Sequence, residues 1–177
     1  LVAGGIPCAE ITLRTPAGAA AIAATAGVAG FTVGAGTVLS ADDVDRSADS
    51  GAEFIVSPGF DDEVVERAIP RGLAVLPGIA TATELQRARR AGLDVVKFFP
   101  ADRLGGLETI GSLSGPFPTM RFVPSGGVGA HNAADYLAHP SVFAISGSWM
   151  VPRASIAAGA FDDIEALSAQ AIELVGG

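Results

Sequence analysis

A regular alternation of strand-like and helix-like segments is the feature that most constrains the fold of this chain. Seven short apolar segments, rich in Val, Ile or Phe, recur at intervals of about 20–25 residues and run into Gly, Pro, Ser or Thr. They are "CAEITLR" (8–14), "FTVGAGTV" (31–38), "FIVSPG" (54–59), "AVLPGIA" (74–80), "VVKFFPA" (95–101), "RFVPSGGV" (121–128) and "FAISGSWM" (143–150). Because Ala-rich segments with helical spacing lie between them, the pattern predicts parallel strands joined by helical crossovers.

Two of the intervening segments carry helix-start signals. Ser40 precedes a pair of aspartates, and Thr81 stands three residues before Glu84 with the spacing of a capping box. The second of these segments ends in arginines followed by Gly92, which suits the negative end of a helix dipole and a left-handed cap. We therefore expect helices to begin at Ser40 and at Thr81.

Seven β/α units in 177 residues indicate a single domain over 1–177 of the α/β class, and specifically a (β/α)₈ TIM barrel. A closed barrel of this kind needs eight units, and "LVAGG" at 1–5 has the composition of a last helical turn with its glycine cap. We expect the first strand and most of the first helix to be absent from this sequence. An open, seven-stranded doubly wound sheet is the alternative architecture.

Composition excludes several classes of partner. The formal net charge of −8 argues against nucleic acid or an anionic membrane, because both require a cationic face. One cysteine, Cys8, permits no intrachain disulfide and suits a reducing cytoplasm, and neither Cys8 nor the two histidines form a pattern of metal ligands. No apolar run approaches the roughly 20 residues of a membrane-spanning helix, and no signal-peptide pattern opens the chain. These features predict a soluble, cytoplasmic protein without a metal.

Polar side chains at alternate positions mark the segment "EITLR". Glu10, Thr12 and Arg14 should share one face of a strand, while Ile11 and Leu13 take the other face and pack on helices. A carboxylate and a guanidinium on a buried face are unfavourable unless they are paired or used in chemistry. This pattern indicates a functional strand, with a purely structural Glu–Arg pair as the alternative.

Lys97 is the only lysine of the chain, since the other ten of the eleven basic residues are arginines. Val95 and Phe99 should share its face, with Val96 and Phe98 on the opposite one. A lysine among apolar groups loses hydration, which disfavours its ammonium form, and a neutral amine can form a Schiff base with a ketone. Arginine cannot replace it, because a guanidinium stays protonated. The alternative is a lysine at the rim of the strand that extends to solvent and is held by an acid.

Glycines lie at the ends of the last two predicted strands, as a pair in "PSGGV" (124–128) and singly in "SGSW" (146–149). Backbone N–H groups beside glycine approach an anion closely, and barrels of this class frequently bind phosphate after strands seven and eight. If the absent strand is counted first, these are strands seven and eight, so the pattern predicts a phosphate site that includes Ser148. The segment "GAGTV" similarly ends a strand with small residues and one hydroxyl, from Gly34, Gly36 and Thr37.

In this order, "EITLRT", "GAGTV", "SPG", "PGIATATE", "KFFPA", "PSGGV" and "GSW" resemble the KDPG/KHG aldolase family over essentially the whole chain. These are class I aldolases that cleave 2-keto-3-deoxy-6-phosphogluconate (KDPG). The resemblance implies a (β/α)₈ barrel, a homotrimer, and neither a metal nor a cofactor. Two positions depart from the family pattern, since Ser125 replaces a common threonine and Ser146 replaces a common glycine.

The resemblance also implies roles for individual residues. Lys97 corresponds to the Schiff-base lysine, and Glu10 to the general acid and base. Substrate-binding positions are Arg14, Thr37, Pro58, Phe99 and Ser125. Phosphate-binding positions are Gly126, Gly127, Gly147 and Ser148.

The reaction implied is cleavage of KDPG to pyruvate and glyceraldehyde 3-phosphate, a step of carbohydrate metabolism. One alternative is an aldolase or decarboxylase for an unphosphorylated keto acid, 4-hydroxy-2-oxoglutarate or oxaloacetate, which would share the lysine but not the phosphate site. A second alternative, from a different class, is a non-catalytic phosphosugar-binding barrel. Retention of both Glu10 and Lys97 favours an enzyme, because binding alone does not require a lone lysine.

Overall fold

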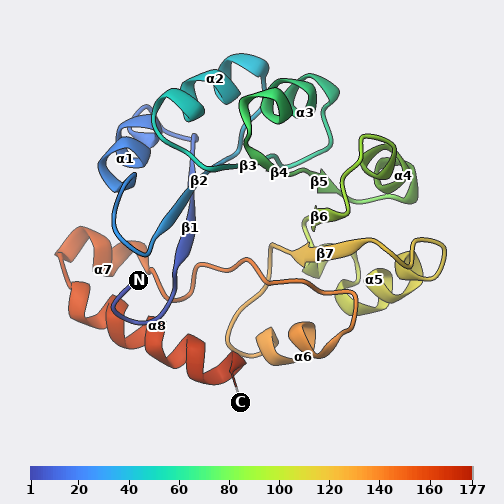
Figure 1. The fold of residues 1–177 in the computed structure, drawn as a ribbon. Helices are drawn as coiled ribbons and strands as arrows, with labels where there is room; N and C mark the ends of the chain where they lie inside the picture. The colour runs from blue at the N-terminus through green and yellow to red at the C-terminus, as the bar shows by residue number, and fades with distance from the viewer. Residues whose placement is uncertain (177) are drawn as a thin grey trace. The chain divides into compact units, whose positions relative to one another are not determined.

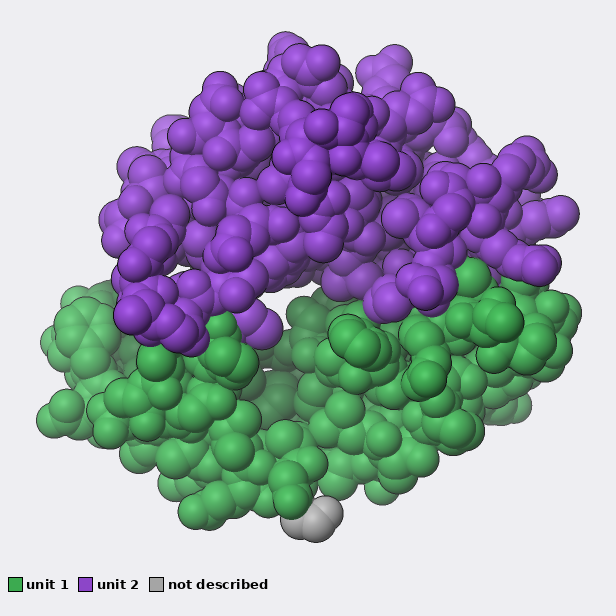
Figure 2. All heavy atoms as spheres, viewed as in Figure 1, with its two compact units in different colours: residues 1–7, 100–177 green, residues 8–99 purple. Residues whose placement is uncertain are grey.

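Parallel strands alternate with helices through the first half of the chain, as the sequence pattern predicts. The structure is a computed structural model that describes residues 1–176, and the chain divides into two compact units. Unit 1 contains residues 1–7 and 100–177, and unit 2 contains residues 8–99 (Figure 2).

Unit 2 carries six of the strands. A four-stranded parallel sheet has the order β1-β2-β3-β4, and β5 pairs with β6, also in parallel. The strands are β1 (Cys8–Thr12), β2 (Thr32–Gly36), β3 (Phe54–Val56), β4 (Ala74–Leu76), β5 (Gly78–Ile79) and β6 (Val95–Phe98). The helices are α1 (Gly18–Thr25), α2 (Ala41–Asp49), α3 (Asp62–Ala68), the 3₁₀ turn η1 (Ile69–Arg71) and α4 (Ala82–Arg90).

The predicted strand 74–80 is divided into two, β4 and β5, with Pro77 between them. Proline lacks the N–H group that continues a ladder, so a break at this position is expected in physical terms. The carbonyl of Pro77 still accepts a hydrogen bond from the N–H of Lys97, at 2.9 Å. The division therefore interrupts β4 without detaching the strand that carries the lysine.

The two faces of the sheet β1–β4 differ in chemistry. One face forms an apolar core with α1, α2 and α3, which lie along that side of the strands in Figure 1. Its buried members are Ile22, Val33, Ala35, Val38, Val44, Ala52, Ile55, Val64 and Ala68, and Ile11 and Leu13 pack against them. The prediction that these last two side chains face helices, opposite Glu10 and Thr12, is confirmed.

Glycines take the place of side chains on the opposite face of β2. Gly34 is paired with Phe54, whose ring occupies the space that a Cβ atom at Gly34 would need. Gly36 follows two residues later on the same face and is paired with Thr12 and Val56. Side chains from the strands on either side therefore extend over the backbone of β2.

Unit 1 is mostly helical. It contains the 3₁₀ turn η2 (Asp102–Leu104), α5 (Gly106–Ser114), β7 (Arg121–Pro124), α6 (Ala133–Ala138), α7 (Arg153–Ala158) and α8 (Phe161–Val175). No helix within residues 1–176 is both long and apolar enough to cross a membrane.

The predicted strand 143–150 is wrong. That part of the chain runs beside β7 but forms only isolated parallel bridges, Phe122 with Val142 and Ser125 with Ser146. Phe143 is mostly exposed, and the run then continues into serines and a glycine, residues that pack poorly in a sheet. The apolar residues correctly predicted that this segment runs beside a strand, but the segment does not form continuous β-sheet hydrogen bonds.

Residues 1–5 form the glycine-ended turn that their composition predicts. The N–H of Gly5 donates to the carbonyl of Val2 at 2.9 Å, and that of Ile6 to the carbonyl of Leu1 at 3.1 Å, which is the hydrogen-bond pair of a Schellman motif. Gly5 has the positive φ of 88° that this motif requires. A Cβ atom at Gly4 would lie 2.5 Å from the backbone carbonyl of Glu165, so the glycine lets the turn pack against α8.

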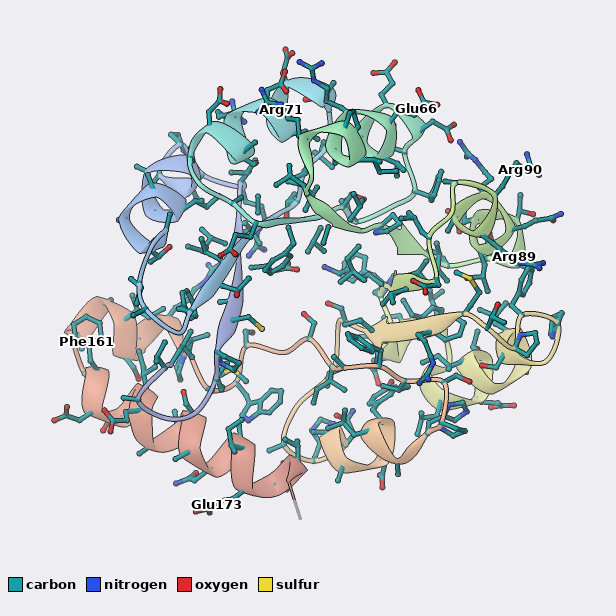
Figure 3. The ribbon with its side chains drawn as sticks, viewed as in Figure 1. Glu66, Arg71, Arg89, Arg90, Phe161 and Glu173 are labelled. Carbon is teal, nitrogen blue, oxygen red and sulfur yellow. The ribbon has the colours of Figure 1, made fainter. Side chains whose placement is uncertain are left out.

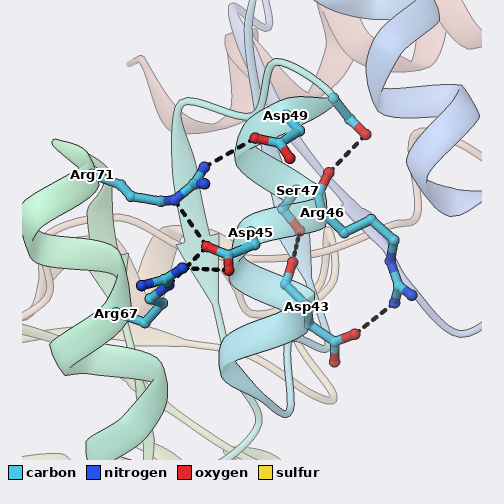
Figure 4. A network of polar contacts seen from close by, with 8 residues as sticks. Asp43, Asp45, Arg46, Ser47, Asp49, Arg67 and Arg71 are labelled. Atoms are coloured by element: carbon cyan, nitrogen blue, oxygen red, sulfur yellow. Dashed lines mark hydrogen bonds and ion pairs between the residues drawn. The ribbon is translucent and has the colours of Figure 1, made fainter.

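Charged side chains lie on the outside of unit 2. Glu66, Arg71, Arg89 and Arg90 point away from the strands (Figure 3). Figure 4 shows an ion-pair network in which Asp45 of α2 accepts hydrogen bonds from Arg67 at 2.6 and 2.8 Å and lies 2.9 Å from Arg71. The hydrogen bond from Arg67 holds the pKa of the Asp45 carboxyl below its usual value. Because these groups are solvated, they fix how the two helices are aligned more than they stabilise the fold.

Both predicted helix starts are confirmed. The Ser40 hydroxyl accepts from the N–H of Asp43 at 3.2 Å, and Thr81 and Glu84 form a reciprocal capping box at the start of α4. The Glu84 carboxylate accepts from the N–H groups of Ala80 and Thr81, each at 2.9 Å. Burial by itself raises the pKa of Glu84, but these hydrogen bonds outweigh burial and hold it below the usual value of 4.5.

The capping box makes stability depend on pH in a defined direction. Because the folded-state pKa of Glu84 is lowered, its contribution is present above the unfolded-state value of 4.5 and is lost as the pH falls through the folded-state value. We expect Glu84→Gln to lower the free energy of unfolding by about 1 kcal/mol at neutral pH, with the difference from wild type shrinking in acid. Urea unfolding at several pH values measures this, with the exposed Glu66→Gln as control. A difference that stays constant down to the acid limit would contradict the assignment.

Candidate active site

Lys97 and Glu10 meet although 87 residues separate them in the chain. The Lys97 Nζ lies 3.5 Å from Oε1 of Glu10, and the two side chains are only 9% and 23% exposed. Glu10 comes from the middle of β1, and Lys97 from β6. The buried amine of Lys97 and the half-buried carboxylate of Glu10 are therefore within ion-pair distance of each other. The sequence predicted both residues as functional, and the structure places them together.

Lys97 has apolar side chains on the opposite face of its strand, and an aromatic ring and a carboxylate near its amine. Val96 and Phe98 are fully buried on the face opposite the lysine, as the alternation predicts. The Nζ atom lies 5.3 Å from the centroid of the Phe99 ring, which comes directly after β6. The backbone of Lys97 is held by β5, since Gly78 is its pairing partner. The amine thus stands at the end of a rigid strand, beside an aromatic face and a carboxylate.

Arg14 and Thr12 stand on the Glu10 side of β1. Nε of Arg14 donates to Oγ1 of Thr12 at 3.1 Å, which fixes the direction of the guanidinium just beyond the end of the strand. The proposed structural Glu10–Arg14 pair does not form, because Glu10 pairs with Lys97 instead. Among residues 1–176 no carboxylate lies within ion-pair distance of Arg14, so its terminal N–H groups remain available to an anionic ligand.

Thr37 has an uncommon backbone conformation. Its φ of 58° lies in the left-handed region, and no other described residue apart from glycines has a positive φ. This conformation is unfavourable for a β-branched residue, and strain of this kind is concentrated at functional sites. Thr37 directly follows Gly36, the last residue of β2, so its hydroxyl lies at the same end of the sheet as Arg14.

Pro58 lies two residues beyond β3, next to the strand pair that holds the lysine. Its backbone carbonyl occupies the space that a Cβ atom at Gly78 would need, and Gly78 is the residue paired with Lys97. The Ser57 hydroxyl donates to the carbonyl of Gly59 at 2.7 Å and so stabilises this turn. In unit 2, contacts join Lys97 to Glu10 and to Phe99, and Arg14, Thr37 and Pro58 follow the ends of β1, β2 and β3.

The predicted phosphate-binding positions belong to unit 1. Gly126 and Gly127 both have positive φ, 88° and 83°, and turn the chain after β7. Asn132, which the sequence reading missed, fixes this turn by donating to the carbonyl of Gly127 at 3.0 Å and accepting from the N–H of Gly129 at 2.9 Å. Its signal in the sequence is an Asn three residues after a glycine, directly before a helix.

The second glycine segment lies beside the first. The Ser125 hydroxyl donates to the Ser146 hydroxyl at 3.4 Å, and the N–H of Ser146 donates to the carbonyl of Pro124 at 3.0 Å. The Trp149 ring covers Gly147 so closely that a Cβ atom there would collide with it. Ser148 is exposed. Within unit 1 the two segments that the sequence pattern singled out are therefore neighbours.

Asp102 is a second residue that the sequence reading missed. Its N–H donates to the carbonyl of Gly126 at 3.0 Å, and its side chain occupies the space where a Cβ atom at Gly127 would lie. Burial raises the pKa of Tyr136, and the charge of Asp102 raises it further. This cluster makes glycine obligatory at position 127 for two reasons, the backbone angle and the packing.

Concave surface alone does not locate the site. A shallow hollow is lined by Leu13, Arg14, Thr15, Pro16, Ala19 and Arg46, and it contains neither Lys97 nor Glu10. Within residues 1–176, His, Cys, Asp and Glu side chains form no group of three that could hold a metal ion. The chemistry that the arrangement supports is nucleophilic attack by an amine with a carboxylate beside it for proton transfer.

Comparison with known proteins gives consistent matches. The family described as "Aldolase: KDPG and KHG aldolase" matches residues 1–167. A "2-dehydro-3-deoxy-phosphogluconate aldolase" of Treponema pallidum is 49% identical over 177 residues, which cover 99% of this chain and 84% of the relative.

Two solved structures resemble the chain closely. The 2-keto-3-deoxy-6-phosphogluconate aldolase of Zymomonas mobilis ZM4, crystallised with 3-phosphoglycerate, is 41% identical with a TM-score of 0.89, over 96% of this chain and 80% of that one. The KDPG aldolase of Legionella pneumophila, with pyruvate captured as a covalent carbinolamine intermediate, is 34% identical with a TM-score of 0.91, over 96% and 82%.

The strained backbone of Thr37 leads to a stability prediction. Replacing Thr37 by glycine relieves about 1–3 kcal/mol of strain in the folded state. The greater flexibility of glycine in the unfolded state offsets about 0.5–1 kcal/mol of this gain, so Thr37→Gly should raise the free energy of unfolding by about 1 kcal/mol. The matched control is Thr32→Gly, at the exposed start of the same strand, which should lower it by a similar amount. Chemical denaturation measures both. Equal destabilisation by the two substitutions would show that Thr37 is not strained.

Proposed function

The chain belongs to the KDPG and KHG aldolase family, and on this premise we propose that it is a class I aldolase cleaving 2-keto-3-deoxy-6-phosphogluconate to pyruvate and glyceraldehyde 3-phosphate. The observation that carries the proposal is the part-buried Lys97–Glu10 pair, with Nζ and Oε1 3.5 Å apart. A single lysine placed on a strand end against a carboxylate is what an imine mechanism needs, since one group attacks and the other moves protons.

The first step joins the substrate to the enzyme. The unprotonated Lys97 amine attacks the C2 ketone, and a C–N bond forms while the carbonyl oxygen takes up a proton to give a carbinolamine. Loss of water then leaves a protonated imine, which is an electron sink at C2. Phe99 offers its ring face to this cation, just as it does to the Nζ atom in the free protein.

The second step breaks the carbon–carbon bond. The Glu10 carboxylate accepts the proton of the C4 hydroxyl, the C3–C4 bond breaks, and its electron pair moves into the imine to form an enamine. Glyceraldehyde 3-phosphate leaves with the new carbonyl. Glu10 returns a proton to C3, and water then releases pyruvate and the free lysine. Oriented proton transfer of this kind accelerates a reaction by about 10²–10⁴-fold.

The remaining residues of unit 2 orient the keto acid. The exposed guanidinium of Arg14, aimed by Thr12, is suited to bind the substrate carboxylate with charge-assisted hydrogen bonds. Thr37 adds a hydroxyl at the same end of the sheet, and Pro58 limits the space beside β5. These assignments give the carboxylate a fixed position so that C2 lies within reach of Lys97.

The phosphate group is assigned to unit 1. The backbone at Gly126 and Gly127, the neighbouring Gly147, and the hydroxyl of Ser148 supply donors without a cation, in the manner of a backbone anion site. Ser146 adds a hydroxyl to this set through its contact with Ser125. The crystallised Zymomonas relative carries a phosphorylated ligand, 3-phosphoglycerate, which supports a phosphate-bearing substrate.

Experiments can distinguish two other functions from KDPG cleavage. An aldolase or decarboxylase for 4-hydroxy-2-oxoglutarate or oxaloacetate would use Lys97 without the glycine segments, and the family name includes the KHG activity. A non-catalytic phosphosugar-binding protein would use those segments alone. Turnover of substrates with and without phosphate distinguishes the first, and calorimetric binding of KDPG without pyruvate release would identify the second.

The wider architecture is part of the same proposal. The likeness to solved aldolases of the family supports one (β/α)₈ barrel domain. The resemblance of the sequence motifs to this family implies a homotrimer. The single cysteine and the phosphorylated substrate are consistent with the cytoplasm. Light scattering of the purified chain measures the assembly.

The imine intermediate can be trapped. We expect borohydride to fix pyruvate irreversibly on Lys97, giving one adduct that peptide mass mapping locates in the segment 95–101. Lys97→Arg should keep its fold and form no adduct, because a guanidinium remains protonated and is a poor nucleophile. The chain has no other lysine, so the N-terminal amine is the one competing site, and mapping distinguishes the two. A folded wild-type protein without an adduct at Lys97 would refute the mechanism.

The phosphate assignment predicts a selective loss. Ser148→Ala should lower kcat/KM for KDPG by about tenfold or more, because a hydrogen bond to a charged group contributes about 1.5–3 kcal/mol. The same variant should turn over 4-hydroxy-2-oxoglutarate as the wild type does, and this second substrate is the internal control. If both substrates lose activity equally, Ser148 acts on the fold or on the keto acid and not on phosphate.

A further inference from the structure

We propose that Gly36 is a positioning residue of the aldolase reaction, because the absence of its side chain determines where the Glu10 carboxylate stands relative to Lys97. The proposal rests on the proposed function, in which Glu10 transfers protons to and from the substrate held by Lys97. Gly36 touches no reacting atom in this scheme, and it acts through the side chain of Glu10.

The geometry at Gly36 is specific to one side chain. An ideal Cβ atom at this position would lie 2.7 Å from Oε1 of Glu10, 2.9 Å from its Cδ and 3.3 Å from its Cγ, and these are the three nearest atoms. Oε1 is also the oxygen that lies 3.5 Å from Nζ of Lys97. The carboxylate oxygen that faces the lysine therefore rests on the backbone of β2, in space that only glycine leaves open.

The backbone itself does not require glycine at this position. Gly36 lies within β2, pairs with Thr12 and Val56, and is not among the residues with positive φ. Gly127 is different, since it has a φ of 83° and the Asp102 side chain fills its Cβ position. Gly34 is different as well, because the rigid Phe54 ring lies over it. At Gly36 the obstacle is the flexible end of a glutamate, so alanine is compatible with the fold.

A methyl group at Gly36 therefore acts on chemistry and not on folding. The Glu10 carboxylate can move aside by rotating about its side-chain torsions, which places Oε1 away from Lys97. A displacement of about 1 Å in a catalytic group lowers a rate by roughly 10²-fold. Attack by Lys97 on pyruvate needs only the amine and the ketone, whereas proton transfer at C3 needs the carboxylate in place. We expect proton transfer to fall about 10²-fold while the trapped Lys97 adduct still forms.

Gly36→Ala tests the inference, with Gly111→Ala as the matched control. Gly111 lies in α5, and the nearest atom to its Cβ position is 3.7 Å away. Exchange of the pyruvate methyl protons in D₂O, followed by NMR, measures proton transfer, and borohydride trapping measures imine formation. Gly36→Ala should lose exchange about 10²-fold, retain trapping, and keep or raise its midpoint of urea unfolding. Gly111→Ala should leave exchange and trapping unchanged.

A double-mutant cycle separates positioning from a general structural effect. If Gly36 acts through Glu10, then Gly36→Ala added to Glu10→Gln should lower exchange no further than Glu10→Gln does alone. A further loss by the same factor, or unfolding of the single variant, would overturn the inference. Failure of the imine mechanism gives a different result, since wild-type protein would then show neither exchange nor trapping, and failure of the phosphate assignment alone would leave both intact in wild type. Normal exchange in Gly36→Ala, with active wild type, overturns the positioning role alone.

Discussion

The ion pair between Lys97 and Glu10 is the interaction on which the rest of unit 2 depends. The Lys97 side chain is 9% exposed and its Nζ lies 3.5 Å from Oε1 of Glu10, so β1 and β6 must place these two residues at matching positions. The strands satisfy this requirement by being short and parallel, with apolar residues on the helix side and polar residues on the other. A functional pair in the interior thus explains why a chain with ten arginines keeps one lysine.

Small residues in the sheet make room for that pair. The strands on either side of β2 carry larger side chains, Glu10 on β1 and Phe54 on β3. These side chains extend over Gly36 and Gly34 of β2, which leave the space free. β2 buries no apolar side chain on the glycine face, whereas Val33 and Ala35 are buried in the core on the other face. Strand stability is consequently carried by the helix-facing side, and the opposite side is left to position reactive groups.

Local sequence patterns predicted the strands correctly where apolar and polar residues clearly alternate. They failed where a strand depends on hydrogen bonds with a segment that is distant in the sequence. The faces of Glu10 and Lys97 followed from period two, and the caps at Ser40 and Thr81 followed from residue type. The segment 143–150 has strand-like residues but lacks a continuous partner, which no local pattern reveals. Asn132 and Asp102 were missed for a related reason, because their roles arise from contacts with the glycine turn and not from any motif of their own.

Glycine has two distinct physical roles in this chain, and a sequence motif does not separate them. At Gly126 and Gly127 the backbone has positive φ, so the residue type is fixed by the turn itself. At Gly36 the backbone is ordinary strand, and the residue type is fixed by a carboxylate that needs the space. A substitution at the first kind of glycine disturbs a loop, whereas one at the second meets the Glu10 side chain. Because Glu10 packs directly on the backbone of Gly36 and also contacts Lys97, the residue type at position 36 affects the surroundings of the lysine.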